Sequence, residues 1–411
     1  IYGKEDFNAL CSMIKEHADE LGVNVKLEQS NHEGDIVDKI QNIENKASNN
    51  YSLLEGNSSG FGTRINPVCA ASRYTKIALS PIVESMLNKD DLDIVDKQYF
   101  EGSYIEPKFF IPTFPILFLN GSHGVSTGFA QDVYPRNPNE IIKYIECKLS
   151  NKKFKGDLLP WFKGFKGEIK LNTETNKIEC FGILTKINST TYQIDELPIG
   201  MEYDKYIEVL EKLCDSNIIT DYSDKCDTKT DNISFEIKTT RDFSKKYDNK
   251  QEDLYRIFKL VKTLPETLCC INENNEVVEY NNIIEILDDF IKIRLEYYNK
   301  RKDYILNKLD EKLKILNSKY KFCDSIIKGD LVISKVKKAD IIAKLEAISG
   351  IEKVNNNYDY LLNMPIHSIS YETLTKLKND ISELKDKQKE VKTTDINTMW
   401  LNDLANLKKY F

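Results

Sequence analysis

Hydrophobic positions follow a helical period over the last third of the chain. From residue 283 to about residue 322, apolar or aromatic side chains recur at steps of three, four or seven, which keeps them on one helix face: Leu287, Ile291, Tyr298, Ile305, Leu309, Leu313, Leu316 and Tyr320. A second run has 3-4 spacing with a polar break at Gln388: Leu374, Leu377, Ile381, Leu384 and Val391. Ser370 can cap this second helix, and Glu372 suits its positive end. The two faces, about fifty residues apart, predict long helices packed antiparallel, although an ordinary helical bundle would give the same pattern.

The first 280 residues have weaker and mixed patterns. Helical spacing predicts helices over residues 5–21 and 75–87, and the Gly-, Ser- and Asn-rich stretch 52–68 predicts a loop. Alternating apolar and polar residues over 187–197 and 232–239 predict strands of an antiparallel region. The chain is therefore divided into three regions: 1–150 with short helices and turns, 151–280 rich in strands, and 281–411 predominantly helical.

Length and composition are typical of a globular protein with several domains. The 411 residues are 41% hydrophobic and 30% charged, enough for a sizeable core. Nine scattered cysteines without a zinc-binding spacing favour reduced intracellular thiols. The apolar-looking run 109–119 is broken by Pro112 and Pro115 and is too short to span a bilayer. With no secretory or transit segment visible, we expect an intracellular, soluble protein, and its start at Ile1 rather than Met predicts that the natural N-terminus is missing.

The charge is acidic overall, but one stretch of the sequence is basic. A net charge of −7 weighs against nucleic acid as a partner unless positive charge is concentrated in one place. Between residues 143 and 170, lysines outnumber nearby acids: Lys143, Lys148, Lys152, Lys153, Lys155, Lys163, Lys166 and Lys170. Solvated surface lysines would have the same composition, so the charge alone leaves both interpretations open.

Three segments carry the most specific chemical signal. FGTR occupies residues 61–64, AASRYTKIALSP residues 70–81, and FFIPTFPILFLNGSHGVSTGF residues 109–129. In the second segment Arg73 precedes Tyr74. A phenol has an unperturbed pKa of about 10, so its attack on a phosphodiester at neutral pH needs a neighbouring cation, base or metal. A guanidinium stays charged and fits phosphate oxygens with two donors. Taken alone, Tyr74 would be one more structural tyrosine among 22.

In this order, the three segments resemble the cleavage–religation core of type IIA DNA topoisomerases. The resemblance implies that Tyr74 is the nucleophile that forms a transient 5′-phosphotyrosyl link, with Arg73 at the scissile phosphate. His32, in SNHEGD, is similar to an active-site histidine of the family. When the glycines are aligned, however, Glu33 replaces one family histidine and His32 the residue before it.

The resemblance also implies the DNA contacts. Val125, in LNGSHGVSTGF, takes the position of an apolar wedge, usually isoleucine, that enters the minor groove and bends the duplex. Valine is shorter than isoleucine, so we expect a weaker bend; a buried glycine-rich hairpin is the structural alternative. The expected DNA-binding residues besides Val125 are Arg64, Lys76, Lys163 and Lys166.

The fold that the resemblance implies is an α+β multidomain arrangement. Residues 1–150 would form a winged-helix (CAP-like) DNA-binding domain with the active-site tyrosine, 151–280 an α/β tower domain, and 281–411 a long antiparallel coiled coil with a helical exit-gate region. Only five residues, INPVC, separate FGTR from AASRY, which resembles the medium subunit of T-even-type bacteriophage topoisomerases. The alternative is a fragment of a single-chain eukaryotic-type or large-virus topoisomerase II.

The expected cofactors and partners follow from the same resemblance. The sequence shows neither a glycine-rich ATP site nor a recognisable metal constellation, and the resemblance implies that a TOPRIM/ATPase large subunit binds both Mg²⁺ and ATP. Double-stranded DNA and a second copy, joined through the C-terminal region, are the other expected partners, with no membrane. The protein would act in the host cytoplasm if phage-encoded and in the nucleus if a eukaryotic-type fragment. The alternatives are a noncatalytic dimeric DNA-binding architectural protein and a coiled-coil scaffold that does not bind DNA.

Overall fold

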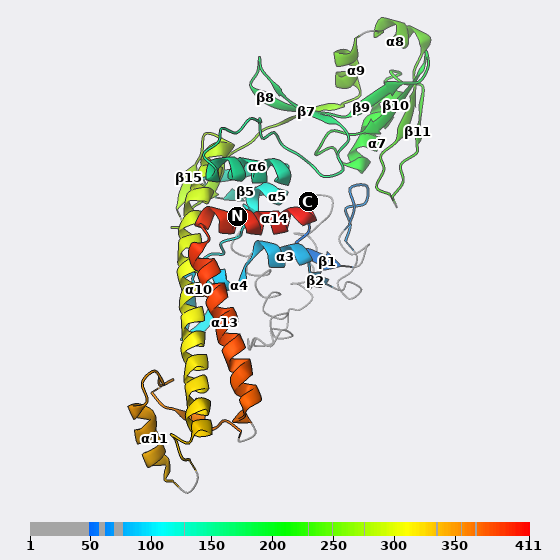
Figure 1. Cartoon of the computed structure of the whole chain (residues 1–411). Coiled ribbons are helices and arrows are strands. Elements are labelled where there is room, and N and C mark those ends of the chain that lie inside the picture. Colours follow the sequence, from blue (N-terminus) through cyan, green and yellow to red (C-terminus); the bar gives the residue numbers. More distant parts are fainter. Residues whose placement is uncertain are drawn as a thin grey trace. The chain divides into compact units, whose positions relative to one another are not determined.

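The computed structural model divides the chain into two compact units, drawn in Figure 1. Unit 1 comprises residues 1–88, 97–291 and 404–411, and unit 2 comprises residues 89–96 and 292–403. The structure describes residues 49–56, 62–69, 77–126, 128–228, 230–248, 250–274, 276–333, 336–354, 356–365 and 368–411. The helix predicted over residues 5–21 and the site candidates His32, Arg73, Tyr74 and Lys76 lie outside these residues.

A short antiparallel ladder is the first regular structure described in unit 1. β1 (Leu54–Gly56) pairs with β2 (Ile77–Leu79), and α3 (Pro81–Met86) follows. The predicted loop 52–68 therefore contains a strand, and the predicted helix 75–87 is wrong over the residues of β2. Ser80 keeps an extended backbone (φ −68°, ψ 140°) because the following proline clashes with a helical conformation there. The helix begins at Pro81, where the missing N–H needs no partner.

Three β-hairpins and two short helices are the next elements described in unit 1. The hairpins are β3 (Lys97–Phe100) with β4 (Ser103–Pro107), β5 (Ser122–Ser126) with β6 (Phe129–Val133), and β14 (Cys269–Ile271) with β15 (Val277–Glu279). α5 (Leu117–Asn120) leads directly into β5, and α6 (Pro138–Leu149) follows β6. These two helices bury Phe118, Leu119, Ile141 and Ile145 completely, which fixes the ends of the β5–β6 hairpin to a core.

Two antiparallel sheets make up residues 168–264 of unit 1. The first sheet has the strand order β13-β8-β7 and consists of β7 (Glu168–Asn172), β8 (Lys177–Phe181) and β13 (Val261–Leu264). The second sheet has the strand order β11-β12-β10-β9. It consists of β9 (Ile183–Lys186), β10 (Thr191–Glu196), β11 (Asp221–Asp224) and β12 (Phe235–Lys238). The strands predicted within 187–197 and 232–239 are confirmed as β10 and β12. The second sheet shares a buried core with α7 (Tyr203–Asp215) and α9 (Gln251–Ile257), while α8 (Arg241–Lys246) follows β12.

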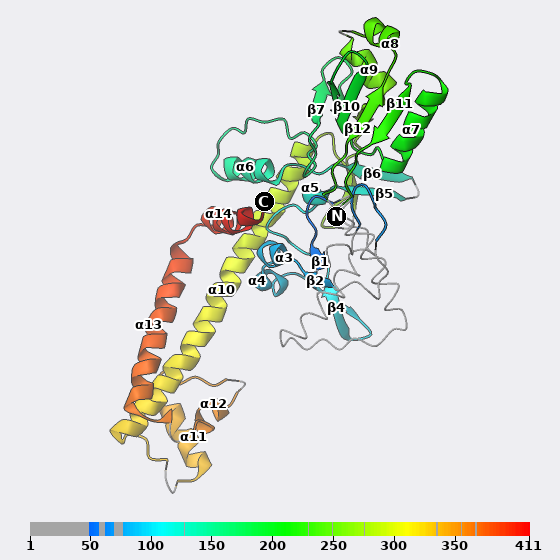
Figure 2. The ribbon, with the colours of Figure 1, turned by 90° about the vertical axis from the view of Figure 1, so that its right-hand side faces the viewer.

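Unit 2 is built on two long helices that lie side by side in Figures 1 and 2. They are α10 (Ile283–Lys328), whose first residues belong to unit 1, and α13 (Tyr371–Thr393). Lys302 Nζ donates hydrogen bonds to the carbonyl oxygens of Lys392 (3.1 Å) and Thr394 (2.7 Å). Further along, Phe322 shares a buried cluster with Leu374 and Leu377. Lys302, earlier in α10, thus contacts the end of α13, while Phe322, later in α10, packs near the start of α13, so the predicted antiparallel packing is confirmed.

Four shorter α-helices belong to the described residues of unit 2, and the last of them runs on into unit 1. They are α4 (Lys89–Leu92), α11 (Lys338–Ala347), α12 (Asp359–Leu362) and α14 (Ile396–Leu407), which the 3-10 helix Lys408–Tyr410 follows. The predicted cap of α13 is confirmed, because Ser370 Oγ accepts a hydrogen bond from the Thr373 N–H (3.3 Å). The predicted combination of helices with antiparallel sheets is thus confirmed at the level of a mixed α/β fold.

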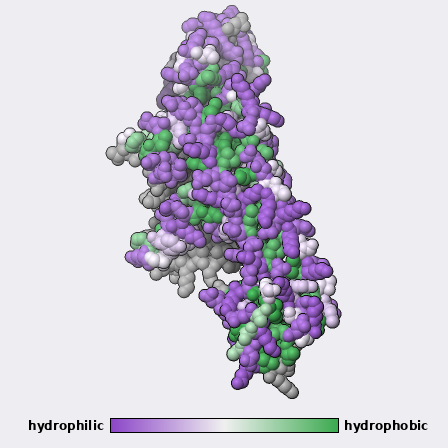
Figure 3. Space-filling view, turned by 60° about the vertical axis from the view of Figure 1, so that its left-hand side comes forward, coloured by the Kyte–Doolittle hydropathy of each residue, from purple (hydrophilic) through white to green (hydrophobic). Residues whose placement is uncertain are grey.

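The surface is largely polar on the face drawn in Figure 3, with hydrophobic residues in smaller groups. Among the residues described, none of the helices combines the length and apolar character needed to cross a bilayer.

Candidate nucleic-acid interface

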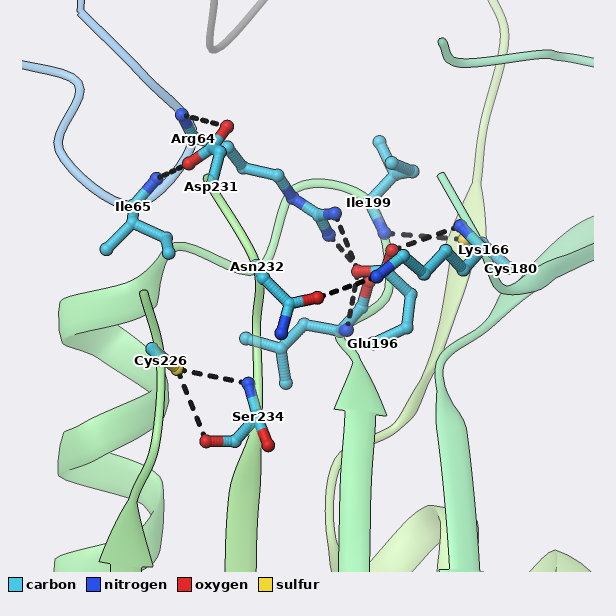
Figure 4. Close-up of polar contacts among 11 residues, drawn as sticks. Arg64, Ile65, Lys166, Cys180, Glu196, Ile199, Cys226, Asp231, Asn232 and Ser234 are labelled. Carbon is cyan, nitrogen blue, oxygen red and sulfur yellow. Dashed lines mark hydrogen bonds and ion pairs between the residues drawn. The ribbon is translucent and has the colours of Figure 1, made fainter. Parts of the chain in front are cut away.

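Arg64 of the FGTR segment is held against the four-stranded sheet of unit 1 (Figure 4). Its Nη1 lies 2.6 Å from Glu196 Oε1, and its Nη2 donates to the Leu197 carbonyl at 2.8 Å. The main chain is fixed as well, because Asp231 accepts from the N–H groups of Arg64 (3.0 Å) and Ile65 (2.9 Å). The Arg64 side chain remains 25% exposed. One edge of this guanidinium is therefore committed to the protein while part of its surface faces solvent.

Glu196 is the centre of this cluster, although its side chain is only 4% exposed. Besides Arg64, it accepts hydrogen bonds from the main-chain N–H groups of Lys166 (3.1 Å) and Leu197 (2.9 Å). Lys166 Nζ donates to Asn232 Oδ1 at 2.7 Å, as Figure 4 shows. Two residues predicted to bind DNA, Arg64 and Lys166, thus meet at one buried carboxylate.

Lys163 occupies a neighbouring aromatic environment. Its Nζ lies 3.9 Å from the centroid of the Tyr51 ring, which itself stacks on Trp161. A cation over an aromatic face is attracted by the ring quadrupole. Partial burial lowers the pKa of Lys163 and raises that of Tyr51. The ammonium group is nevertheless on an exposed residue, so it remains available to an anionic partner.

Val125 lies on a separate element, the β5–β6 hairpin, and is 82% exposed. It pairs with Ala130 in the ladder, and Phe129 nearby is 48% exposed. Gly128 in the connection has φ +86°, a conformation that favours glycine. A second glycine, Gly121, enters the hairpin with φ +79°, and a Cβ there would stand 2.5 Å from the Val133 carbonyl oxygen. The alternative of a buried hairpin is wrong for Val125, because its side chain is in solvent.

The base of the hairpin is polar and buried, in contrast to its apolar end. Arg136, 1% exposed, donates to both carboxylate oxygens of Glu266 (2.8 and 2.7 Å) and to the Tyr134 carbonyl (2.7 Å). Glu266 also accepts from the Tyr134 N–H at 3.1 Å, and Asp132 and Thr267 exchange main-chain hydrogen bonds. Burial lowers the pKa of Arg136 against the opposing effect of Glu266, and burial next to Asp132 and Glu266 raises the pKa of Tyr134 to about 12. These contacts hold the exposed end of the hairpin on a rigid support.

The sequence motifs contain several residues of this site whose roles the sequence did not reveal. Glu196 lies inside YQIDELPIG, but only its tertiary contacts show that it is a shared acceptor. Asn120 lies inside LNGSHG, and only its tertiary contacts show that it pairs with Tyr51. Asp231 belongs to no motif. In the described part of the chain, no group of three His, Cys, Asp or Glu side chains is arranged to hold a metal ion.

The site therefore combines cationic groups around Glu196 and Tyr51 with an exposed apolar residue on a supported hairpin. Comparison with known proteins gives its class. The family model for the A subunits of DNA gyrase/topoisomerase IV matches residues 28–405, so the chain belongs to this family. The resemblance inferred from the motifs is confirmed.

Particular relatives agree with this assignment. The mitochondrial DNA topoisomerase 2 of Dictyostelium discoideum is 31% identical over 88% of this chain, and the chain spans 28% of that protein's length. The DNA topoisomerase medium subunit of Enterobacteria phage T4 is 25% identical over 89% of this chain and 80% of its own length. The crystal structure of the DNA-binding, cleavage and re-ligation domain of Plasmodium falciparum topoisomerase II matches 98% of this chain and 60% of that one, with a TM-score of 0.84 and 28% identity.

Proposed function

We propose that this chain is the DNA cleavage–religation part of an ATP-dependent type IIA topoisomerase, an isomerase that passes one duplex through another. The observation that carries the proposal is the exposed Val125 on a hairpin with a buried, charged base. An apolar side chain that projects into solvent gains nothing in the isolated protein, but inserted between base pairs it unstacks and bends DNA. In this proposal residues 1–150 form the winged-helix domain, 151–280 the tower, and 281–411 the coiled coil and exit gate.

Tyr74 is the proposed nucleophile. Its phenolic oxygen forms a bond to phosphorus while the bond to the 3′ oxygen breaks, which leaves a 5′-phosphotyrosyl link and a free 3′ hydroxyl. The phenolic proton passes to solvent during the attack, and the departing 3′ oxygen takes up a proton from solvent to become the hydroxyl. Arg73 neutralises charge on the phosphate, where His32 is proposed to assist. Religation is the reverse attack by the 3′ hydroxyl.

The cationic cluster is proposed to grip the DNA backbone beside the cleavage site. Arg64, Lys163 and Lys166 lie on the described surface, and Lys76 would join them two residues after Tyr74. Contacts to phosphates position a duplex without reading its sequence, which suits an enzyme that bends and cuts at many places.

The partners of the proposed enzyme are a second copy of this chain, joined through the C-terminal region, and a TOPRIM/ATPase subunit that binds Mg²⁺ and ATP. Two copies related by a twofold axis would cut opposite strands. The relationship to topoisomerase 2 proteins and to the phage T4 medium subunit supports this proposal.

Covalent trapping tests the proposal. End-labelled duplex DNA is incubated with the protein, Mg²⁺ or Ca²⁺, and a TOPRIM-bearing partner, and the reaction is stopped with denaturant. We expect protein attached to 5′ ends, dependence on the partner, and loss of the adduct in Tyr74→Phe. Salt-sensitive DNA binding without an adduct, in the presence of a partner shown to be active, would instead identify an architectural DNA-binding protein.

A further inference from the structure

A buried amide joins two segments of unit 1 that are far apart in the sequence. Asn120, 8% exposed at the end of α5, exchanges two hydrogen bonds with the main chain of Tyr51. The Tyr51 N–H donates to Asn120 Oδ1 at 2.9 Å, and Asn120 Nδ2 donates to the Tyr51 carbonyl at 2.6 Å. The side chain thus satisfies both polar groups of one buried peptide residue, as an adjacent strand would.

The neighbouring Asn50 adds three hydrogen bonds that hold the same segment. Its Nδ2 donates to the carbonyl oxygens of Trp161 (3.0 Å) and Leu119 (3.3 Å), and its Oδ1 accepts from the Lys163 N–H (2.8 Å). We call Asn50, Tyr51 and Asn120 the amide clip. Three hydrogen bonds, two from Asn120 and one from Asn50 to Leu119, hold residues 50–51 against the segment that enters the β5–β6 hairpin. The other two bonds of Asn50 hold the same residues against Trp161 and Lys163.

Each side of the amide clip leads directly to an element with a task in the proposed reaction. Two residues after Asn120, β5 begins, and it carries Val125. Three residues after Tyr51, β1 begins and pairs with β2 in the register Leu54 to Leu79 and Gly56 to Ile77. β2 starts three residues after Tyr74. The clip therefore links the hairpin that bears the proposed wedge to the ladder that follows the proposed nucleophile in the sequence.

The geometry of this link distinguishes it from the supports of either element alone. The hairpin has its own base in Arg136 and Glu266, which does not involve residues 49–56. The β1–β2 ladder has its own hydrogen bonds, extended by the Ser80 N–H to the Leu53 carbonyl (3.0 Å). Loss of the Asn120 amide would leave both elements formed but would remove two of the three hydrogen bonds of the amide clip that join them.

We propose that Asn120 is a positioning residue that couples the DNA-bending hairpin to the segment bearing Tyr74. This inference rests on the proposed function of Tyr74 and Val125. Through the amide clip, a duplex bent over Val125 presents its phosphate at a fixed distance from the nucleophile. Misplacement of reacting groups by even about 1 Å can slow a reaction by about 100-fold.

The first test compares bending and cleavage in Asn120→Ala, using the full chain with its TOPRIM-bearing partner. We expect cleavage to fall between about 10-fold and about 100-fold, while DNA bending, measured by fluorescence transfer between labelled duplex ends, stays within about twofold of wild type. The control is Asn137→Ala, which removes another side-chain-to-backbone bond in unit 1, the cap of α6. It should leave both bending and cleavage unchanged. Wild-type cleavage by Asn120→Ala would overturn the inference, as would an equal loss of bending and cleavage.

A second variant gives a readout that a purely structural asparagine would not affect. In Asn120→Asp the ionised carboxylate can accept from the Tyr51 N–H but cannot donate to the Tyr51 carbonyl, whereas the protonated acid can do both. Cleavage by Asn120→Asp, relative to wild type at each pH, should therefore recover as the pH is lowered, and that of Asn120→Ala should not. A ratio independent of pH would contradict the inference, and this variant decides if Asn120→Ala does not fold.

The controls separate this inference from the proposed function. If wild type forms no adduct with an active partner, or if Tyr74→Phe still cleaves, the proposed nucleophile is wrong. If both behave as expected and the Asn120 variants cleave normally, only the coupling is wrong.

Discussion

Arginine is buried against carboxylates in both units, and the two sites differ in how their charges are balanced. In unit 1, Arg136 pairs with one carboxylate, that of Glu266, whose side chain is 12% exposed. In unit 2, Arg294 is completely buried beside Asp91 (2.7 Å), and Arg301 lies between Asp91 (3.5 Å) and Asp403 (2.9 Å). The first site is a closed pair, while the second is a network.

The difference follows from what each site joins. The pair in unit 1 links residue 136 to residue 266 at the base of one hairpin, close to solvent. The network in unit 2 joins α4, α10 and α14, and Tyr298 adds a hydrogen bond to Asp403 (2.7 Å). The stability of a buried charge network depends on every member, because a single charged group in it can neutralise more than one neighbour. We therefore expect the network to be the more sensitive of the two to a single substitution.

The largest expected effect is that of Asp91→Asn in unit 2. The change removes the charge of the carboxylate that contacts both buried guanidinium groups, so the free energy of unfolding of unit 2 should fall by about 3–5 kcal/mol. Trp400, fully buried against Tyr298, reports this transition in urea when the only other tryptophan is replaced by Trp161→Phe.

The control for this prediction uses an exposed pair on the same two helices. Lys308 contacts Asp90 at 3.2 Å with side chains 44% and 33% exposed. Lys308→Ala should change the unfolding free energy by no more than about 1 kcal/mol. Equal urea midpoints for the two variants would show that the buried network contributes no more than a surface ion pair.

A smaller effect is expected for Glu266→Gln in unit 1. The substitution keeps the shape and one acceptor but leaves Arg136 without its counter-charge, so stability should fall by about 1–3 kcal/mol. Trp161 fluorescence in a Trp400→Phe background follows unit 1, and Glu168→Gln, which affects the exposed pair with Lys170, is the control. A loss as large as that of Asp91→Asn would remove the distinction between pair and network.

Arg64, whose side chain is 25% exposed, tests whether an arginine held by a buried carboxylate can also contact DNA. Arg64→Met should weaken DNA binding and reduce the slope of log affinity against log salt by about 1, since one phosphate contact is lost. Glu196→Gln removes the intramolecular carboxylate but leaves the guanidinium, so it should not reduce that slope. An unchanged slope in Arg64→Met would mean that this arginine only joins the FGTR segment to the sheet.

The sequence predicted the parts of this molecule that repeat and missed those that depend on a distant partner. The long helices α10 and α13 were predictable because their apolar steps extend over many turns. The same stripe contained an unused signal: Arg294 and Arg301 stand at helical steps from Ile291, Tyr298 and Ile305, and an arginine on an apolar face needs a buried carboxylate.

Short strands had no comparable signal. β1 and β2 have three residues each, so their pairing with one another decides their conformation, and helical spacing over 75–87 was misleading. The candidate site was predicted in part. The family resemblance implied a wedge at Val125, whereas Asn120 and Glu196 gain their roles from partners that include residues 69 and 132 positions away in the sequence.

The smallest effect on stability, and the clearest on DNA, is expected at Val125. Its side chain is 82% exposed, so Val125→Ala should change the unfolding free energy by less than about 0.5 kcal/mol. The bend measured by fluorescence transfer should nevertheless decrease, and Val125→Ile should increase it, because the depth of an apolar wedge determines how far a base step opens. Val68→Ala, at another valine that is 73% exposed, is the matched control and should leave the bend unchanged. If Val125→Ala bends DNA as strongly as wild type, Val125 is not a DNA-bending wedge. The exposed apolar end of the hairpin, above the charged base formed by Arg136 and Glu266, would then need an explanation other than DNA binding.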